Sequence, residues 1–241
     1  MTSSTAHRFE GSNNDLRRSA VSHVIFDFDG TLSWLRHGWP RIMLDVFLSH
    51  APEGWRQDSE IERRLLSDIF SQNGKPSIHQ MELFCERLQA IGRNSPHRQE
   101  LLDEYQRALR TTIQERVAAI RLSGSPGDFI ICGAKTILQT LHRRGITLII
   151  LSGTVEHEVR AEADLLGLSS FFGRHIYGSP SQGPFSKRDV IDRLMSEEKI
   201  EGQHLLAFGD GPVEIQFTKA VGGLGIGVAS DEDHNGSHKT N

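Results

Sequence analysis

The sequence lacks the features that mark secreted and membrane-spanning proteins. Its 241 residues include only two cysteines, Cys85 and Cys132, which lie far apart and form no C-x-x-C pattern. This excludes a disulfide framework and favours free thiols in a reducing compartment. No run of 18 apolar residues occurs. We therefore expect no membrane-spanning helix and no membrane partner.

Charge and the N-terminal segment narrow the class of protein further. The formal net charge is -4 at pH 7, and nothing indicates the clustered basic surface that nucleic acid favours, so we expect no nucleic-acid partner. Residues 1–21 are polar and have no apolar h-region of a secretory signal. The arginines of this segment would suit a transit peptide, but its acidic residues argue against one. We interpret it as a disordered arm and predict a cytoplasmic location.

A short apolar stretch followed by two carboxylates organises the chain. Val24, Ile25 and Phe26 predict a buried strand, and Asp27 and Asp29 follow it just before a Gly-Thr pair. Side chains at positions i and i+2 of an extended segment lie on the same face, so the two carboxylates can converge. Such a pair is costly unless a cation or a shared proton offsets the charge. This predicts a metal site, a proton-handling site, or both.

Residues 34–123 predict an all-helical module. Apolar residues recur there at helical spacing in four successive stripes, beginning near Ile42, Ile61, Ile78 and Leu101. Turn-forming residues separate the stripes, and nothing alternates as a strand would. We therefore expect about four helices in this region.

After the Ser123–Gly127 linker the pattern changes to alternating strands and helices. Apolar runs predict strands over 146–151, 175–178, 204–208 and 223–228. Between them, helices are predicted over 134–144, from 155 to about 166, over 187–199 and over 212–220, the last with Pro212 at its first position. This alternation indicates an α/β fold with a parallel sheet.

Three of the predicted strands end in polar residues: Asp27 and Asp29, then Ser152 and Thr154, then Asp210. Ligands of parallel α/β sheets bind beyond the carboxyl ends of the strands, so we expect these side chains to be neighbours. The helical module follows the first strand directly and should lie over this edge like a lid.

The same residues resemble the motifs of the haloacid dehalogenase-like phosphohydrolases over roughly residues 22–230. The resemblance is carried, in order, by Asp27-Phe28-Asp29-Gly30-Thr31, Ser152, Lys187 and Gly209-Asp210-Gly211 followed by Glu214. The inserted helices resemble the cap of the phosphoglycolate phosphatase-like branch. Taken singly, Ser152 also suits a helix N-cap and Lys187 a solvated helix start. Their order and placement favour the motif interpretation.

The resemblance implies a Rossmann-like parallel sheet with an inserted all-α cap. It implies a catalytic core of residues 22–33 and 124–230, a cap of residues 34–123 and a polar tail of residues 231–241. Arg36, His37 and Trp39 lie where the chain leaves for the cap. Substrate contact and linker packing are equally compatible with their position.

The resemblance also implies roles for individual residues. Asp27 would be the nucleophile that forms an aspartyl phosphate, and Asp29 the general acid and then base. Ser152 and Lys187 would bind the phosphoryl oxygens, and Thr31 and Gly153 would belong to the same substrate site. Mg²⁺ would be held by Asp27, Asp29 through its backbone carbonyl, and Asp210. Glu214 would reach the metal, directly or through water, or only orient Lys187.

These roles predict a Mg²⁺-dependent phosphatase that acts on a small phosphorylated metabolite, such as a sugar phosphate or phosphoglycolate. The protein would be a monomer or a homodimer. A phosphomutase would use the same four motifs. A non-catalytic binding module is a third possibility, to which Glu214 in the acidic motif lends some support. A dehalogenase is disfavoured because Asp29 and the acidic motif would have no purpose on a neutral carbon centre.

Overall fold

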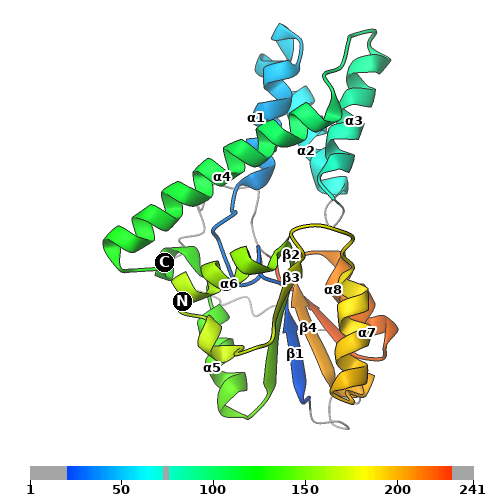
Figure 1. Ribbon diagram of the computed structural model, residues 1–241. Coiled ribbons are helices and arrows are strands. Elements are labelled where there is room, and N and C mark those ends of the chain that lie inside the picture. The colour runs from blue at the N-terminus through cyan, green and yellow to red at the C-terminus, as the bar shows by residue number, and fades with distance from the viewer. Residues whose placement is uncertain (1–20, 73–75, 230–241) are drawn as a thin grey trace, which may run out of the picture.

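The computed structural model of the chain describes residues 21–72 and 76–229. The predicted polar tail and nearly all of the predicted N-terminal arm lie outside these residues. The described part consists of an α/β unit and a cluster of helices that follows its first strand (Figure 1). The predicted fold class, a parallel α/β sheet with an all-helical insertion, is confirmed.

The α/β unit is built on a five-stranded parallel sheet with the order β3-β2-β1-β4-β5. The strands are β1 His23–Phe26, β2 Thr147–Val155, β3 Ile176–Ser179, β4 Leu205–Gly209 and β5 Leu224–Gly227. β1 lies in the centre, where Phe26 is in register with Ile150 on one side and Phe208 on the other. The residues that follow these three positions therefore meet at one edge of the sheet.

Both faces of the sheet are covered, which explains the nearly continuous apolar character of its central strands. Val24 and Phe26 pack toward α5 and α6, whereas Ile25 packs toward α7 and α8. This alternation follows from the two-residue period of a strand. The flanking helices are α5 Ala134–Arg143, α6 Glu156–Leu165, α7 Lys187–Glu197 and α8 Pro212–Ala220.

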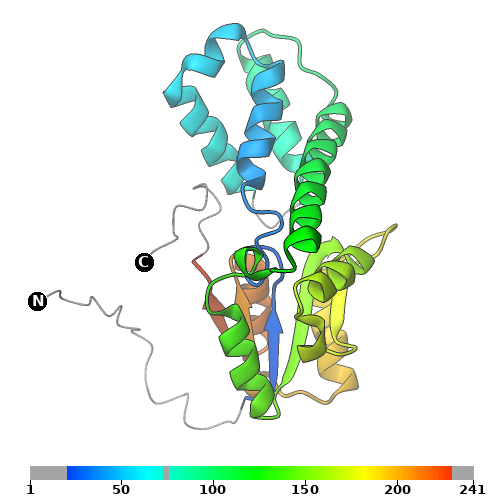
Figure 2. The ribbon, with the colours of Figure 1, turned by 90° about the vertical axis from the view of Figure 1, so that its left-hand side faces the viewer.

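The helical insertion has a hydrophobic core of its own. It comprises α1 Trp39–His50, α2 Ser59–Ser71, α3 Ile78–Ala90 and α4 Arg98–Ser123. The rings of Phe47 and Phe84 stack in its centre with their centroids 4.3 Å apart. Helix α4 belongs to both parts, because Leu101 packs among the other helices and Ile120 packs against the sheet side (Figure 2). It is the element that ties the insertion to the α/β unit.

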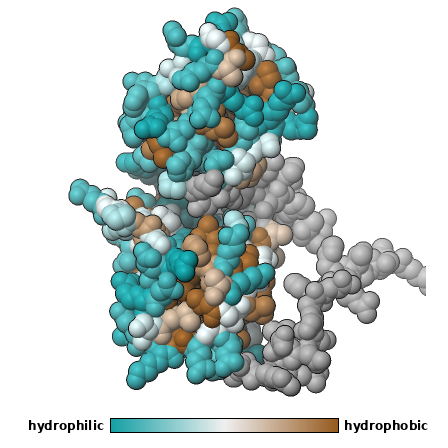
Figure 3. Space-filling view, turned by 90° about the vertical axis from the view of Figure 1, so that its right-hand side faces the viewer, coloured by the Kyte–Doolittle hydropathy of each residue, from teal (hydrophilic) through white to brown (hydrophobic). Residues whose placement is uncertain are grey.

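The space-filling view shows the helical insertion and the α/β unit as two lobes with a narrowing between them (Figure 3). Single-turn 3₁₀ helices complete the described elements, at Glu53–Gln57, Gly127–Phe129, Ser169–Phe171 and Gly202–His204. Both cysteines are free, Cys85 buried and Cys132 exposed. No helix of the described residues is both long enough and apolar enough to cross a membrane.

One strand differs from the prediction. β2 was expected to end at Leu151, but it continues to Val155, which pairs with Ser179 of β3 after an irregularity in the register. Ser152 and Gly153 have little strand propensity of their own, although Thr154 is β-branched. Their extended conformation comes from this pairing with β3, which tertiary context supplies and local sequence does not.

Candidate active site

A cavity of about 1440 Å³ lies between the carboxyl edge of the sheet and the helical insertion. All but one of the residues predicted to bind or react with substrate or metal line it: Asp27, Asp29, Ser152, Gly153, Lys187, Asp210 and Glu214. The exception is Thr31, which is buried behind the cavity. Its hydroxyl accepts a hydrogen bond at 3.1 Å from the backbone N–H of Asp210.

Asp27 lies directly after β1, in the centre of the sheet edge. Its backbone N–H donates to the carbonyl of Phe208, so it continues the pairing with β4. Its carboxylate accepts a hydrogen bond at 2.8 Å from Nζ of Lys187. Burial raises the pKa of Asp27 well above its ordinary value, and the neighbouring Glu214 and Asp210 carboxylates raise it further, whereas Lys187 opposes the shift.

Lys187 and Glu214 meet beside Asp27 from the first turns of two helices. Lys187 opens α7 after the N-cap Ser186, whose hydroxyl accepts from a backbone N–H in the first turn. Nζ of Lys187 donates to Glu214, a side chain that is only 2% exposed. Gly209 permits this approach, because a Cβ there would lie 2.9 Å from the Glu214 carboxylate.

The charge of Lys187 is secured by these two contacts. Burial alone would lower the pKa of this lysine, but the Asp27 and Glu214 carboxylates outweigh it and raise the pKa above its ordinary value. Lys187 therefore remains a cation at neutral pH. A lysine held in this way at the base of the cavity can bind an anionic oxygen.

Asp210 follows β4 and interacts directly with the side chain of Asp27. Burial raises the pKa of Asp210 too, and Glu214 adds to the shift. We call Asp27, Lys187, Asp210 and Glu214 the floor of the cavity. Three carboxylates and one lysine leave the floor with an excess of negative charge when all are ionised.

The floor offers carboxylate donors for a hard divalent cation, although they do not form a complete cage around one. In the described part of the chain, no three His, Cys, Asp or Glu side chains stand together as a metal-binding group. Glu214 is turned to Lys187, and the side chain of Asp29 is turned away to Arg36. Asp27 and Asp210 remain as carboxylate donors, and burial raises the pKa of both. Mg²⁺ usually takes one or two carboxylates and keeps several waters, so this donor set fits it.

Asp29 occupies the side of the cavity next to β2. One of its carboxylate oxygens accepts from the hydroxyl of Thr154 at 2.8 Å and from that of Ser152 at 3.5 Å. The other accepts from Nη1 of Arg36 at 3.0 Å. Gly30, with φ +73°, turns the chain immediately after this residue. The two predicted catalytic aspartates thus have different partners, a lysine for Asp27 and an arginine with hydroxyls for Asp29.

Arg36 is held in a bidentate ion pair with Glu162 of α6, at 2.5 Å for Nη1 and 2.9 Å for Nη2. Burial alone would lower the pKa of Arg36, but Asp29 and Glu162 together raise it. Burial raises the pKa of Glu162 despite the opposing effect of Arg36. The position of Arg36 was left open between substrate contact and linker packing, and the structure places it beside Asp29.

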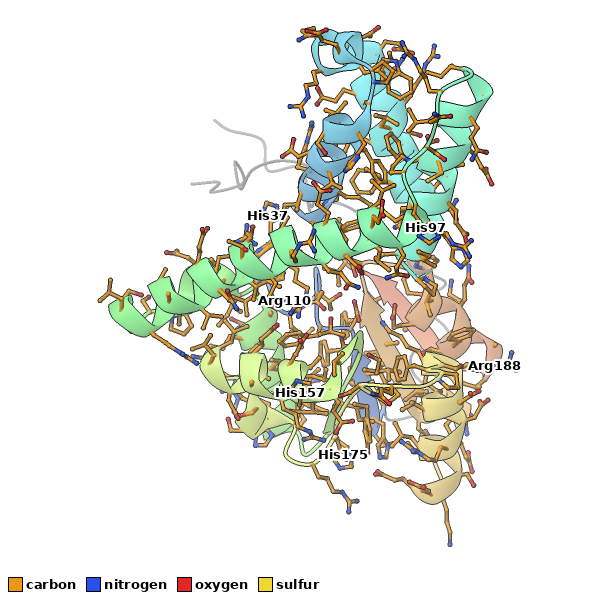
Figure 4. The ribbon with its side chains drawn as sticks, turned by 45° about the horizontal axis from the view of Figure 1, so that its top comes forward. His37, His97, Arg110, His157, His175 and Arg188 are labelled. Atoms are coloured by element: carbon orange, nitrogen blue, oxygen red, sulfur yellow. The ribbon has the colours of Figure 1, made fainter. Side chains whose placement is uncertain are left out.

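One face of α4 forms the side of the cavity opposite the sheet. It consists of Gln106, Leu109, Arg110, Ile113 and Gln114, which recur at helical spacing and which we call the outer wall. Figure 4 shows Arg110 on the side of α4 that faces the α/β unit. Arg110 is exposed. Mixed polar and apolar side chains give this wall the composition of a ligand-selecting surface.

The sequence contains a signal for Glu162 that the motif analysis did not use. Val159 and Ala163 lie on the buried face of α6, and the buried Leu166 follows the helix as its C-cap. Glu162 lies on the same face at helical spacing. A lone acidic residue on an apolar stripe predicts a buried cationic partner. The outer wall has no comparable signal, since its residues read as an ordinary amphipathic helix.

Comparisons with known proteins agree with this arrangement. The family model described as haloacid dehalogenase-like hydrolase matches residues 21–222. Among curated protein sequences, none gives a significant match.

Solved structures share the fold at low sequence identity. A predicted phosphoglycolate phosphatase from Haemophilus somnus 129PT is 15% identical with a TM-score of 0.60, covering 88% of this chain and 87% of that one. A family IA HAD hydrolase from Entamoeba histolytica is 18% identical with a TM-score of 0.60, and the match covers 87% of this chain and 85% of that one. A HAD family hydrolase from Deinococcus radiodurans R1 with bound phosphate and sodium is 17% identical with a TM-score of 0.57, and the match covers 86% of this chain and 80% of that one.

Proposed function

Because the chain belongs to the haloacid dehalogenase-like hydrolases, we propose that it is a Mg²⁺-dependent phosphatase of a small phosphorylated metabolite. Its substrate would be a sugar phosphate or a compound like phosphoglycolate. The observation that carries the proposal is the floor of the cavity. There the buried Asp27 lies 2.8 Å from a lysine whose charge is secured by two carboxylates.

The reaction needs a nucleophile in line with the leaving oxygen and an acid–base group within hydrogen-bonding reach of that oxygen. One oxygen of Asp27 bonds to phosphorus while the bond from phosphorus to the leaving oxygen breaks, and Asp29 gives its proton to that oxygen. Water then attacks the phosphorus of the aspartyl phosphate, the bond from phosphorus to the Asp27 oxygen breaks, and Asp29 takes the proton of the water. Inorganic phosphate leaves, and both carboxyl groups return to their starting states.

The other residues of the site hold the phosphoryl group and its charge. Nζ of Lys187 and the hydroxyl of Ser152 would bind the non-bridging oxygens, and Glu214 keeps Lys187 in position. Asp27, Asp210 and the backbone carbonyl of Asp29 would hold Mg²⁺. Bound there, the ion would offset the excess negative charge of the floor and of the phosphoryl group.

The outer wall would select the leaving group. The cavity of about 1440 Å³ exceeds the volume that a two-carbon phosphate ester would fill. The outer wall combines Leu109 and Ile113 with the guanidinium of Arg110. This combination favours a metabolite whose leaving group has an anionic substituent, and Arg110 would contact that substituent.

A phosphate-release screen tests the proposal. Purified protein is assayed with p-nitrophenyl phosphate and a panel of phosphorylated metabolites, with and without Mg²⁺. We expect Mg²⁺-dependent phosphate release that is lost in Asp27→Ala. Absence of release on every substrate, or full activity in Asp27→Ala, would reject the proposal. Rapid isomerisation of a sugar phosphate without free phosphate would identify a phosphomutase instead.

A further inference from the structure

We infer that Arg36 is a positioning residue that holds the carboxylate of Asp29, and that Glu162 anchors Arg36 for this purpose. The inference rests on the proposed function, in which Asp29 exchanges protons with the leaving group and with water. It concerns the three side chains at the junction between β1, the segment that leads to α1, and α6. We call Asp29, Arg36 and Glu162 the clamp.

The contacts of Arg36 define the clamp. Nη1 donates to Asp29 at 3.0 Å and to Glu162 at 2.5 Å, and Nη2 donates to Glu162 at 2.9 Å. A weaker contact of 3.4 Å joins Nη2 to the half-exposed Glu158. The planar guanidinium can bridge two carboxylates in this way, whereas the ammonium group of lysine is a point charge and cannot reproduce the fork.

Burial makes the anchor costly to leave unpaired. Glu162 is 7% exposed, and the side chain of Arg36 is 12% exposed. A charged group that is buried to this extent requires a partner of opposite charge, and Arg36 and Glu162 are such partners for each other. Glu162 accepts hydrogen bonds only from Arg36 among the contacts described for its side chain. Its position on the buried face of α6 is therefore explained by Arg36.

The backbone that carries Arg36 is fixed from two sides. The N–H of Trp34 donates to the carbonyl of Phe129 in the α/β unit at 2.8 Å. Arg116 of α4 donates to the carbonyls of Trp34 and Leu35, at 3.3 Å and 2.7 Å. Arg36 thus starts from a backbone held by both the α/β unit and the insertion.

This arrangement preorganises Asp29. Its second carboxylate oxygen is held by Thr154 at 2.8 Å, so Arg36 and Thr154 together fix the plane of the carboxyl group. A proton-transfer group is effective only within hydrogen-bonding reach of the reacting oxygen, and its orientation decides that reach. Without Arg36, the hydroxyls of Thr154 and Ser152 still hold one oxygen of the carboxylate, but the other oxygen loses its partner and the group is less well oriented. The chemical step is then slowed without loss of phosphate binding at Lys187.

The kinetic test compares Arg36→Gln and Glu162→Gln with the control Asp164→Asn, an exposed acidic residue of the same helix. We expect the first two to lower kcat by about tenfold to a hundredfold, as misplacement of a reacting group does, with KM within about threefold of wild type. The control should behave as wild type. Free guanidinium should restore part of the activity of Arg36→Ala, whereas the same concentration of sodium chloride should not.

Other kinetic results would overturn the inference. A large rise in KM with unchanged kcat in Arg36→Gln would show that Arg36 contacts the substrate. Wild-type kinetics in both Arg36→Gln and Glu162→Gln would show that the clamp has no part in catalysis. Absence of guanidinium rescue together with a loss of folded protein would show a purely structural pair.

A second measurement does not depend on turnover. Urea unfolding of wild type, Asp29→Asn, Arg36→Gln and the double variant forms a double-mutant cycle. We expect Asp29→Asn to be less favourable for the unfolding midpoint in the wild-type background than in the Arg36→Gln background, because only the wild type loses the contact with Arg36. Equal shifts in the two backgrounds would contradict the clamp. If the wild type released no phosphate from any substrate but the double-mutant cycle showed coupling between residues 29 and 36, the proposed function would be rejected while the Arg36–Asp29 contact would be supported.

Discussion

The floor and the outer wall of the cavity are built in opposite ways. The floor consists of buried and half-buried residues that contact one another, at the ends of central strands and in the first turns of α7 and α8. The outer wall is one face of α4, and its arginine is exposed. The floor is thus fixed by the core of the α/β unit, whereas the outer wall has room to meet different leaving groups.

Under the proposed function, this difference would assign separate tasks to the two regions. Chemistry that is common to all phosphate esters requires groups held in one geometry, which the floor provides. Recognition of the leaving group requires side chains that can be exchanged without disturbing the core, which the outer wall provides. Changes in the floor should therefore affect every substrate alike, and changes in the outer wall should affect substrates selectively.

The largest effect is expected from Asp27→Asn. The amide cannot attack phosphorus, so kcat should fall by at least about a thousandfold for p-nitrophenyl phosphate and for every accepted metabolite. Steady-state rates over the substrate panel measure this. A loss confined to some substrates would break the division between floor and outer wall.

The next largest effect is expected from Lys187→Gln. Loss of the cation removes one contact to the phosphoryl oxygens and leaves Asp27 and Glu214 without their shared partner, so kcat/KM should fall by about a hundredfold. The matched control is Arg188→Gln, the adjacent residue, whose side chain is 63% exposed (Figure 4). An equal loss in both variants would mean that α7 as a whole, and not Lys187, is responsible.

A smaller and selective effect is expected from Arg110→Ala. KM should rise by about tenfold, or ~1.4 kcal/mol, for substrates with an anionic leaving group, because a charge-assisted contact is lost. The kcat value and the KM for p-nitrophenyl phosphate should be unchanged. Arg107→Ala is the control, since this exposed arginine of α4 does not line the cavity. A fall in kcat on all substrates would contradict the assignment of α4 to selection.

The smallest effect is on stability and depends on pH. The raised pKa values of Asp27 and Asp210 mean that the folded protein without Mg²⁺ binds more protons than the unfolded chain above about pH 4, the ordinary aspartate value. Their contribution to stability is complete below that pH and is lost as the pH rises through the folded-state values. At neutral pH, Asp210→Asn should therefore raise the Tm by about 3 °C.

Thermal unfolding with and without Mg²⁺ measures this prediction. Mg²⁺ should raise the Tm of wild type more than that of Asp210→Asn, because the ion and the substitution relieve the same repulsion. A lower Tm in Asp210→Asn without Mg²⁺ would show that Asp210 stabilises the fold through contacts and not through the metal.

The fold and the residues at the strand ends were accessible from the sequence because they depend on local signals, whereas Lys187 and Glu214 were predicted through the family resemblance. Apolar strands that end in Asp27, Ser152 and Asp210 predicted both the parallel sheet and the meeting of these residues at one edge. The extension of β2 to Val155 was missed, because Ser152 and Gly153 are weak strand formers and pairing with β3 carries the strand past them. The clamp was missed because Arg36 and Glu162 are 126 positions apart, and only the packing of α6 brings them together.

Detection of a phosphoryl group on Asp27 tests the central claim most directly. In Asp29→Asn, p-nitrophenyl phosphate should still phosphorylate Asp27, since its leaving group needs little protonation, whereas hydrolysis of the intermediate should stall without a base. Acid quenching followed by peptide mass spectrometry should find the mass of one phosphoryl group on the peptide that contains residue 27. Turnover of wild type with no such peptide in Asp29→Asn, or with the group on another residue, would contradict the mechanism.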